Sequence, residues 1–322
     1  MANLLITRAC NRQCRYCFAQ GGFLLNAAAA PASAGVHMSI AALEEAIAFV
    51  KRSHSGVVGL MGGEPGLHPE LPEIVDRLLD AGLRIRLFTG GVVPDPVVDF
   101  LAGVDPERVR VVVNIPSPGD RLAAPARRRI DRLLRQLGPH AFASYTICDA
   151  HTDLRFLIDT ITRFGMHPSV RLGLALPRME TQSPAALPVS EYEAVGRQVV
   201  RLARESDRDG FFMELDCGFP RCMFSDRDIE VLRERHCRLV FACSPSVDIG
   251  PDLTAWSCFP LESLGRVRIQ DFADRAEMVR HFQAQQRPYR NFGIYERCVS
   301  CERKRNGECA GGCLAQVIRT FR

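Results

Sequence analysis

The feature that most constrains the fold of this 322-residue chain is an alternation of strand-like and helix-like stretches over its first 200 residues. Helical patterns include 39–53, with Ser39 as a candidate N-cap, and 69–82, which begins with Pro69 and ends in Gly82. Six such repeats predict a parallel sheet with crossover helices, too few for a closed eight-stranded barrel. We therefore expect an α/β fold with a partial (βα)6, TIM-like barrel. The predicted strands are the apolar or β-branched runs at 3–7, 57–61, 84–89, 108–115, 142–147 and 170–176.

The composition and the hydrophobic pattern of the chain change after about residue 207. Helical periodicity weakens, and cysteines and glycines become frequent. We place a boundary near 208, with a barrel domain over 1–207 and a small cysteine-rich domain over 208–322. The alanine-rich stretch 27–35 is predicted to be a loose loop.

Composition excludes several classes of protein. The formal charge of +4 comes from 41 basic and 37 acidic residues, and the basic residues do not form the dense block of a nucleic-acid arm. Nucleic acid is therefore not an expected partner. No run of eighteen apolar residues occurs, and the start of the chain lacks the apolar segment of a signal peptide. We expect a cytoplasmic protein without a membrane span.

Thirteen cysteines are an unusual number for such a chain. Disulfides are rare in the cytoplasm, and an odd count does not suit a fully paired framework, so the thiols indicate metal or redox chemistry. They form a front group and a back group, with one thiol between them: Cys10, Cys14 and Cys17; Cys148; and Cys217, Cys222, Cys237, Cys243, Cys258, Cys298, Cys301, Cys309 and Cys313.

The front group has the spacing C-x3-C-x2-C directly after the first predicted strand. Three thiolates on one short loop can hold three irons of a [4Fe–4S] cluster and leave the fourth open to bind a small molecule. The alternative is a zinc loop short of one ligand. Zinc sites prefer paired C-x2-C knuckles with four ligands, which disfavours that reading.

Two motifs together resemble the radical S-adenosylmethionine (radical SAM) superfamily. The first is the cysteine motif with an aromatic residue, Tyr16, before its last cysteine, and the second is "GGEP" at 62–65, at the end of the second predicted strand. The resemblance implies that the open iron chelates the amino and carboxylate groups of S-adenosylmethionine. It also implies reductive cleavage of that cofactor to a 5′-deoxyadenosyl radical, with electrons from an external donor such as a flavodoxin or a ferredoxin.

The residues of "GGEP" suit a binding turn by themselves. Gly62 and Gly63 let the backbone approach a ligand closely, Glu64 offers a carboxylate to a cationic amine, and Pro65 stiffens the turn. The alternative is a solvated β–α turn.

Three further cofactor contacts are expected by position. Family members often carry Thr-Asn-Gly at the end of the third strand, where this chain has "TGG" from Thr89, without the asparagine. Asn114, near the end of the fourth strand, and Arg171, near the start of the sixth, can touch the ribose or carboxylate of the cofactor or make structural hydrogen bonds instead.

The back group resembles the SPASM extension of radical SAM enzymes that mature peptides. The upstream spacing is Cys237-x5-Cys243-x14-Cys258, and the tail reads C-x2-C-x7-C-x3-C from Cys298 to Cys313. In that family the middle gap of the tail is five residues and a final cysteine follows. The resemblance implies two auxiliary [4Fe–4S] clusters, and no cysteine follows Cys313 to complete the second.

Several groupings of the back thiols stay open. The family pattern joins Cys237, Cys243, Cys258 and Cys313 in one cluster and leaves Cys298, Cys301 and Cys309 for the other, with Cys217 or Cys222 as the fourth ligand. The second grouping joins Cys217, Cys222, Cys243 and Cys258 and keeps Cys298, Cys301, Cys309 and Cys313 together. An open iron that binds substrate is a third arrangement, and a zinc site in part of the set is a fourth.

Cys148 follows the fifth predicted strand, at the end where barrels carry their chemistry. We weigh it as a hydrogen-atom donor to a substrate radical, against the plain role of a small buried apolar side chain.

The expected activity follows from these resemblances. Auxiliary clusters either accept an electron from a substrate radical or coordinate a substrate thiol or amine, so we expect an enzyme that oxidatively cross-links or epimerises a ribosomally made peptide. No leader-binding segment precedes Cys10 in this sequence, and we expect a leader to be bound elsewhere or by a separate protein. The alternatives are a radical SAM dehydrogenase or epimerase of a sugar, cyclitol or amino acid, and a non-catalytic iron–sulfur or zinc protein.

Overall fold

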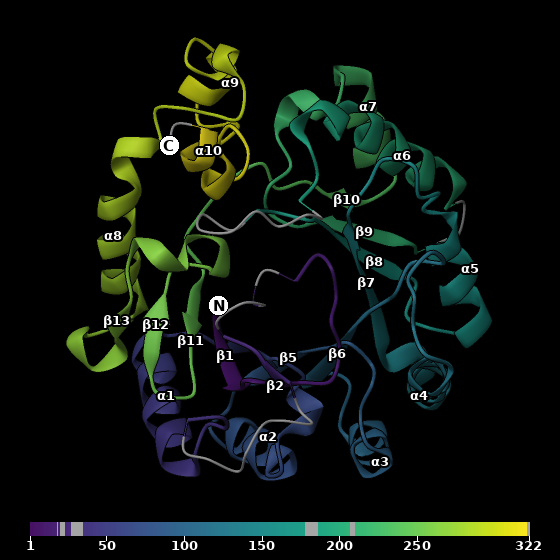
Figure 1. Ribbon diagram of the computed structural model, residues 1–322, viewed down its shortest axis with the longest axis vertical. Helices are drawn as coiled ribbons and strands as arrows, with labels where there is room; N and C mark the ends of the chain where they lie inside the picture. The colour runs from purple at the N-terminus through teal and green to yellow at the C-terminus, as the bar shows by residue number, and fades with distance from the viewer. Residues whose placement is uncertain (18, 20–22, 27–34, 178–185, 207–209, 321–322) are drawn as a thin grey trace.

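The computed structural model describes residues 1–17, 19, 23–26, 35–177, 186–206 and 210–320. Most of the predicted loop 27–35 and the predicted boundary near 208 lie outside these residues. The strands follow a curve with helices along its outer side, and the C-terminal segment, yellow in Figure 1, lies at the upper left of the view. The fold is a mixed α/β fold built on one large sheet. The partial barrel stays an interpretation of this curve.

Eleven strands of the described chain form the large sheet, in the order β10-β9-β8-β7-β6-β5-β4-β1-β11-β12-β13. All six predicted strands are present, and neighbours from β1 to β10 pair in parallel. The strands are β1 (Ala2–Thr7), β4 (Val57–Gly62), β5 (Arg84–Thr89), β6 (Val109–Asn114), β7 (Ala141–Ile147), β8 (Ser169–Leu174), β9 (Phe212–Leu215), β10 (Cys237–Arg238), β11 (Val247–Ile249), β12 (Thr254–Trp256) and β13 (Val267–Arg268), with β2 (Ala9–Cys10) and β3 (Leu25–Asn26) in a separate pair.

Helices α1 to α7 lie between successive strands, as the repeats predict, and α8 to α10 follow the last strand. The Ser39 side chain accepts a hydrogen bond from the Ala42 amide and so caps α1, and α2 ends shortly before Gly82, whose φ is +80°. The helices are α1 (Ile40–Arg52), α2 (Leu71–Asp80), α3 (Asp95–Gly103), α4 (Ala124–Leu137), α5 (Arg155–Phe164), α6 (Tyr192–Glu205), α7 (Asp226–Glu234), α8 (Arg275–Gln286), α9 (Glu302–Arg305) and α10 (Leu314–Thr320).

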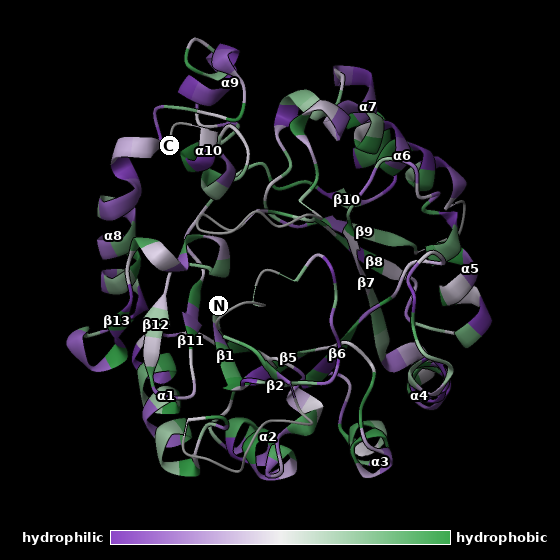
Figure 2. Ribbon diagram, viewed as in Figure 1, coloured by the Kyte–Doolittle hydropathy of each residue, from purple (hydrophilic) through white to green (hydrophobic). Residues whose placement is uncertain are grey.

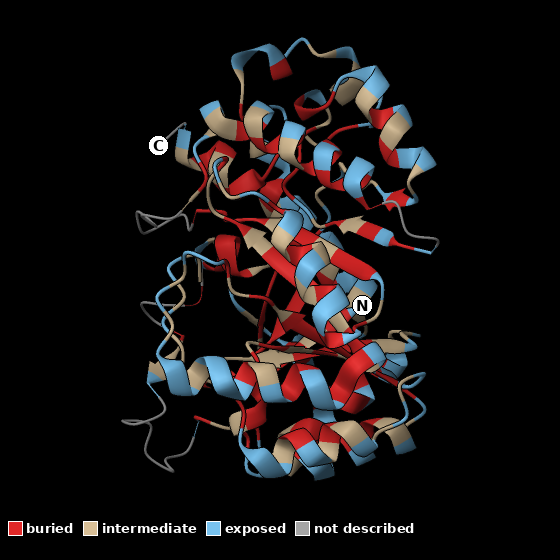
Figure 3. Ribbon diagram, turned by 90° about the vertical axis from the view of Figure 1, so that its right-hand side faces the viewer, coloured by how far each residue is buried: buried red, intermediate tan, exposed pale blue. Residues whose placement is uncertain are grey.

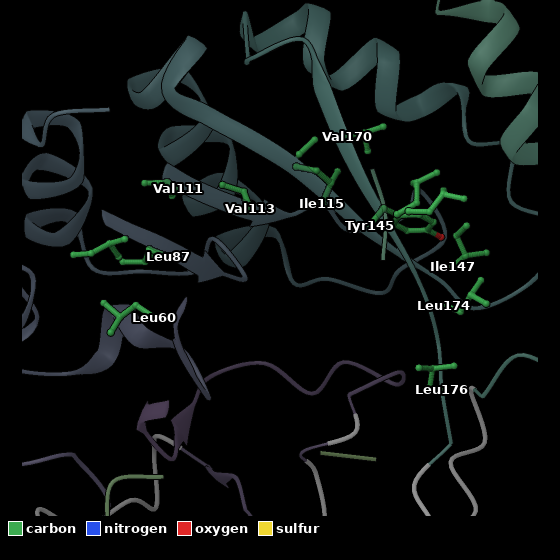
Figure 4. Packing of buried hydrophobic residues seen from close by; sticks show 14 of the residues in the cluster. Leu60, Leu87, Val111, Val113, Ile115, Tyr145, Ile147, Val170, Leu174 and Leu176 are labelled. Atoms are coloured by element: carbon green, nitrogen blue, oxygen red, sulfur yellow. The ribbon is translucent and has the colours of Figure 1, made fainter. Parts of the chain in front are cut away.

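The main core lies between the sheet and the outer helices. Strand side chains alternate in direction, so every second residue faces the helices, as Leu60, Leu87, Val111 and Val113 do in Figure 4. Hydrophobic residues therefore concentrate on the strands and on one side of each helix, while polar residues cover the outside (Figure 2). The buried residues form the central layer of Figure 3. Within the described ranges, no helix is long and apolar enough to cross a membrane.

The sheet does not stop at the predicted boundary near residue 208. Strand β9 pairs with β8 across it, and β10 pairs with β9. The chain then returns to the other edge of the sheet, where β11 pairs in parallel with β1. There Asn3 Nδ2 donates a hydrogen bond of 2.7 Å to Asp248 Oδ1. The C-terminal segment is thus continuous with the sheet, and the two-domain division stays a prediction.

Candidate functional site

The front loop, Cys10–Cys17, lies at the edge of the sheet where the parallel strands end, the edge at which α/β proteins bind their ligands. The amide of Cys17 donates to the Cys14 carbonyl at 3.0 Å, which folds the loop into a turn. Burial raises the pKa of Cys10 to about 11, and Glu64, Cys17 and Cys14 add to the rise. The structure therefore brings the three predicted front thiols together beside the "GGEP" motif.

Backbone hydrogen bonds join that motif to the front loop. The Gly63 amide donates to the Thr7 carbonyl and the Glu64 amide to the Ala9 carbonyl, both at 2.8 Å. A Cβ atom at Gly63 would collide with the Ala9 carbonyl oxygen and lie 2.9 Å from Cys10 Cβ. Glycine is required here because the two segments touch through their main chains.

The Glu64 carboxylate is buried and already accepts three hydrogen bonds. Oε1 accepts from Thr89 Oγ1 at 2.7 Å and from the Gly66 amide at 3.2 Å, and Oε2 accepts from the Gly90 amide at 2.8 Å. Desolvation raises the pKa of Glu64, and these donors oppose the rise. Each carboxylate oxygen can accept two hydrogen bonds, and among the described residues the Gly90 amide is the one donor to Oε2, so this oxygen can accept a further donor such as an ammonium group.

We expect Glu64→Gln to lower the free energy of unfolding by about 1–3 kcal/mol, because the amide nitrogen turns a donor toward the donors at Thr89 or Gly90. Urea unfolding of the folded protein measures this. The matched control is Glu73→Gln on the exposed face of α2, whose ion pair with Arg77 is solvated and contributes little. Equal stability of the two variants would contradict the role of Glu64 in joining β4 to β5.

Two loop residues that the cysteine pattern does not highlight anchor the front loop to the end of β5. Asn11 Nδ2 donates to the Val92 carbonyl at 2.6 Å, and Arg12 Nη1 donates to the Gly90 carbonyl at 2.8 Å. Arg12 also acts electrostatically on Glu64. The signal for them in the sequence is that the residues between the cysteines are polar.

Tyr16 contacts a second predicted cofactor residue. Asn114 Nδ2 donates to the Tyr16 hydroxyl, so the end of β6 is tied to the front loop. Burial raises the pKa of Tyr16, and the charge of Cys14 raises it further. Both side chains lie beside the front thiols, and their contact with a cofactor stays a prediction.

Arg171 lies on β8, and Cys148 directly follows the end of the neighbouring strand β7. Arg171 Nη2 pairs with Asp216 Oδ2 at 2.5 Å, and its guanidinium lies 5.4 Å from the centre of the Phe88 ring. Cys148 Sγ lies 3.4 Å from the Thr146 carbonyl oxygen, and burial raises its pKa to about 12 although the nearby Arg15 lowers it. The thiol thus stays protonated near the front loop.

Four of the nine back thiols gather as a first tetrad. Desolvation raises the pKa of Cys258 well above its ordinary value, and the other three members and Asp248 raise it further. The pKa of Cys217 is also raised well above its ordinary value. Desolvation is the largest cause, followed by the charges of Asp216, Cys313 and Cys243. The members are Cys217, Cys243, Cys258 and Cys313.

The second tetrad lies around the tail. Desolvation raises the pKa of Cys298, and the charges of the other three members add to it. Cys309 Sγ accepts hydrogen bonds from the Arg221 amide at 3.4 Å and the Gly311 amide at 3.3 Å, so the segment with Cys222 touches the tail directly. The members are Cys222, Cys298, Cys301 and Cys309.

Cys237 lies apart from both tetrads, unlike its place in the family pattern. It pairs with Met213 in the first half of β9, and its side chain belongs to the main core on the helix-facing side. Burial raises its pKa to about 12, and Glu214 is the one further cause among the described residues. Strand alternation gives the reason, because Cys237 occupies the face opposite to Glu214 and Arg238.

The spacing of the thiols can be compared with what a single zinc ion and an iron–sulfur cluster each require. Among the side chains that the structure describes, no three His, Cys, Asp or Glu residues lie close enough to hold a single metal ion. A zinc site needs four ligands about 2.3 Å from one ion, whereas the thiolates of a cubane cluster each bind a different iron and stand farther apart. Ligation of clusters by the front loop and the two tetrads therefore belongs to the proposal below.

An aromatic cluster joins the front loop to the first tetrad. Phe23 lies 5.7 Å from Trp256 and 5.2 Å from Phe259 between ring centres, and Cys17 packs against this cluster. Cys258 lies between the two C-terminal aromatic residues in the sequence. The aromatic cluster thus lies between the front loop and the segment that carries Cys258.

Comparison with known families shows what part of the chain resembles. Residues 4–138, less than half of the chain, match the model of the Radical SAM superfamily, and this match indicates an enzyme. This span contains the front loop and "GGEP". A [4Fe–4S] cluster and S-adenosylmethionine are the groups that the superfamily implies.

One curated relative and one solved protein show how far the likeness extends. The 7-carboxy-7-deazaguanine synthase of Methanopyrus kandleri is 30% identical over 119 residues, 35% of this chain and 45% of that protein, so the match spans about half its length. Streptococcus suis SuiB, in crystal structures bound to S-adenosylmethionine and to the precursor peptide SuiA, has a TM-score of 0.66 in both. At 12% identity, over 99% of this chain and 73% or 72% of that one, the likeness to SuiB is one of fold.

Proposed function

We propose that this chain is a radical SAM enzyme that modifies a ribosomally made peptide by oxidative cross-linking or epimerisation, and that both tetrads hold auxiliary [4Fe–4S] clusters. The observation that carries the proposal is the sorting of eleven thiols into a front trio beside "GGEP" and two sets of four. The SuiB fold, solved with a precursor peptide, supports a peptide substrate. A partial barrel over 1–207, a SPASM-like domain over 208–322 and a cytoplasmic location belong to this proposal.

When bound, the front cluster supplies the electron that cleaves S-adenosylmethionine to methionine and a 5′-deoxyadenosyl radical. The chain's own residues hold and shield that site. The front loop offers three thiols, Glu64 Oε2 keeps a position for the amino group, and Tyr16 and Asn114 line the same edge. In this proposal Thr89 acts through Glu64, because its hydroxyl is already used by that carboxylate.

Cys148 is our proposed hydrogen-atom donor if the reaction is an epimerisation. Its S–H bond breaks as a C–H bond forms at the substrate radical, and the thiyl radical left behind needs one electron from the external donor and one proton to return to the thiol. The raised pKa keeps the group as the thiol that this step requires.

A small-molecule substrate is the second candidate. The partial match to 7-carboxy-7-deazaguanine synthase favours it over the part of the chain that the match covers. Short open reading frames beside the gene would favour the peptide, and sugar-pathway genes would favour the second candidate. A non-catalytic metal protein is the third reading.

The test is an anaerobic assay of reconstituted, dithionite-reduced protein with S-adenosylmethionine and peptides encoded next to the gene. We expect 5′-deoxyadenosine together with a peptide changed in mass by the loss of two hydrogens, or in stereochemistry alone. For an epimerase, Cys148→Ala should still form 5′-deoxyadenosine while the epimerised peptide and its solvent-derived deuterium are lost. If neither peptides nor small molecules give 5′-deoxyadenosine, the enzyme proposal fails.

A further inference from the structure

A pocket on the inner face of the sheet lies away from the front loop. Its volume is about 180 Å³, and it lies where strands β5 to β9 begin, whereas the front loop follows the end of β1. Among its lining residues are Arg86, Arg110, Phe142, Phe212 and Glu214. Of the residues given a role above, it includes Arg171, which the sequence predicted as a cofactor contact.

The positive charges of this pocket exceed the carboxylates that can pair with them. Arg86 and Arg110 are direct register partners on β5 and β6, an arrangement in which like charges repel. Glu214 is held by Arg238 at 3.0 Å. Arg171, which also lines the pocket, is held by Asp216.

Arg86 carries a partly buried positive charge that has no partner among the described residues. It is half-buried on the inner face, and within the described part of the chain it makes no ion pair or hydrogen bond. Desolvation lowers its pKa, and Arg171, Arg110 and Arg238 lower it further against the opposing effect of Glu214 alone. A partly buried charge is costly unless an opposite charge accompanies it. Arg110 lies 5.3 Å from the centre of the Phe142 ring and makes no ion pair with the residues that the structure describes.

We propose that this pocket binds a small dianion bearing phosphate or carboxylate groups, held between the Arg86 and Arg110 guanidiniums. Planar guanidiniums bind such oxygens in pairs. The volume has room for about six water molecules, the size of a phosphate or a short dicarboxylate. The site is separate from S-adenosylmethionine cleavage and does not depend on the proposed function.

The test measures the unfolding temperature of the anaerobically reconstituted full chain in low-salt buffer without phosphate. Inorganic phosphate at roughly ten times its dissociation constant should raise the unfolding temperature by about 2–4 °C, beyond sodium chloride of equal ionic strength. The same measurement with malonate, a short dicarboxylate, forms the second arm of the test. A larger shift with phosphate identifies a phosphate group as the preferred ligand, and a larger shift with malonate identifies a carboxylate.

The matched variants are Arg86→Gln and Arg129→Gln, the second on the exposed face of α4. Arg86→Gln should lose the anion-dependent shift while unfolding at or above the wild-type temperature without anion, because the charge removed had no partner. Arg129→Gln should keep the shift. The proposal is overturned if neither anion exceeds sodium chloride, or if Arg86→Gln keeps the shift. These readouts do not use 5′-deoxyadenosine, so their failure is distinct from failure of the enzyme.

Discussion

Replacing Cys10, Cys14 and Cys17 together by alanine is expected to abolish 5′-deoxyadenosine formation and to lower the iron content from about twelve to about eight atoms per chain. In the proposed function all three thiols of the front loop hold one cluster, whereas the two tetrads lie in other segments. Iron quantitation and chromatography of the nucleoside product measure both effects on the same reconstituted sample.

The control for this triple variant is a measurement that its fold is unchanged. The front loop is held by backbone and side-chain contacts that do not use the thiols, such as those of Asn11 and Glu64, so far-UV circular dichroism should match wild type. A fall of all twelve irons would show that the groups do not load independently. An iron content near four in the wild type, or about one zinc with little iron, would count against the auxiliary clusters.

Cys217→Ala is expected to remove up to about four irons, while Cys237→Ala should leave the iron content unchanged. The family spacing predicts instead that Cys237→Ala loses iron, since it makes Cys237 the first ligand of the upstream set. The two variants therefore compare a ligand chosen by spacing with one chosen by tertiary structure. Iron analysis, with electron paramagnetic resonance of the reduced protein, distinguishes them.

Cys222→Ala provides the matching experiment for the second tetrad. It should lose a different cluster from Cys217→Ala, so the double variant should retain about four irons, those of the front loop. Cys237→Ala removes a buried sulfur from the core and costs some stability, which urea unfolding reports separately from iron loss. If Cys237→Ala loses a cluster and Cys217→Ala does not, the assignment of the first tetrad is wrong.

Much of the sheet and of the front site was predictable because its signals are local. The six predicted strands and the capped helix after Ser39 depend on patterns within single segments, and each is present in the structure. Likewise C-x3-C-x2-C places three thiols on one loop whatever surrounds it. The hydrogen bonds of Glu64 are the exception, because its partners Thr89 and Gly90 lie at the end of the next strand and no local pattern predicts them.

The sequence by itself determined the alternating βα order, the front trio beside "GGEP" and the presence of more back thiols than two clusters require. Only the tertiary structure decided how those thiols group. Cys217 and Cys313 are almost a hundred residues apart, and no local pattern relates them. The outcome depends on the direction of strand side chains: Cys237 faces the helices from within β10, whereas Cys217 follows the end of β9, within electrostatic reach of Cys243 and Cys313.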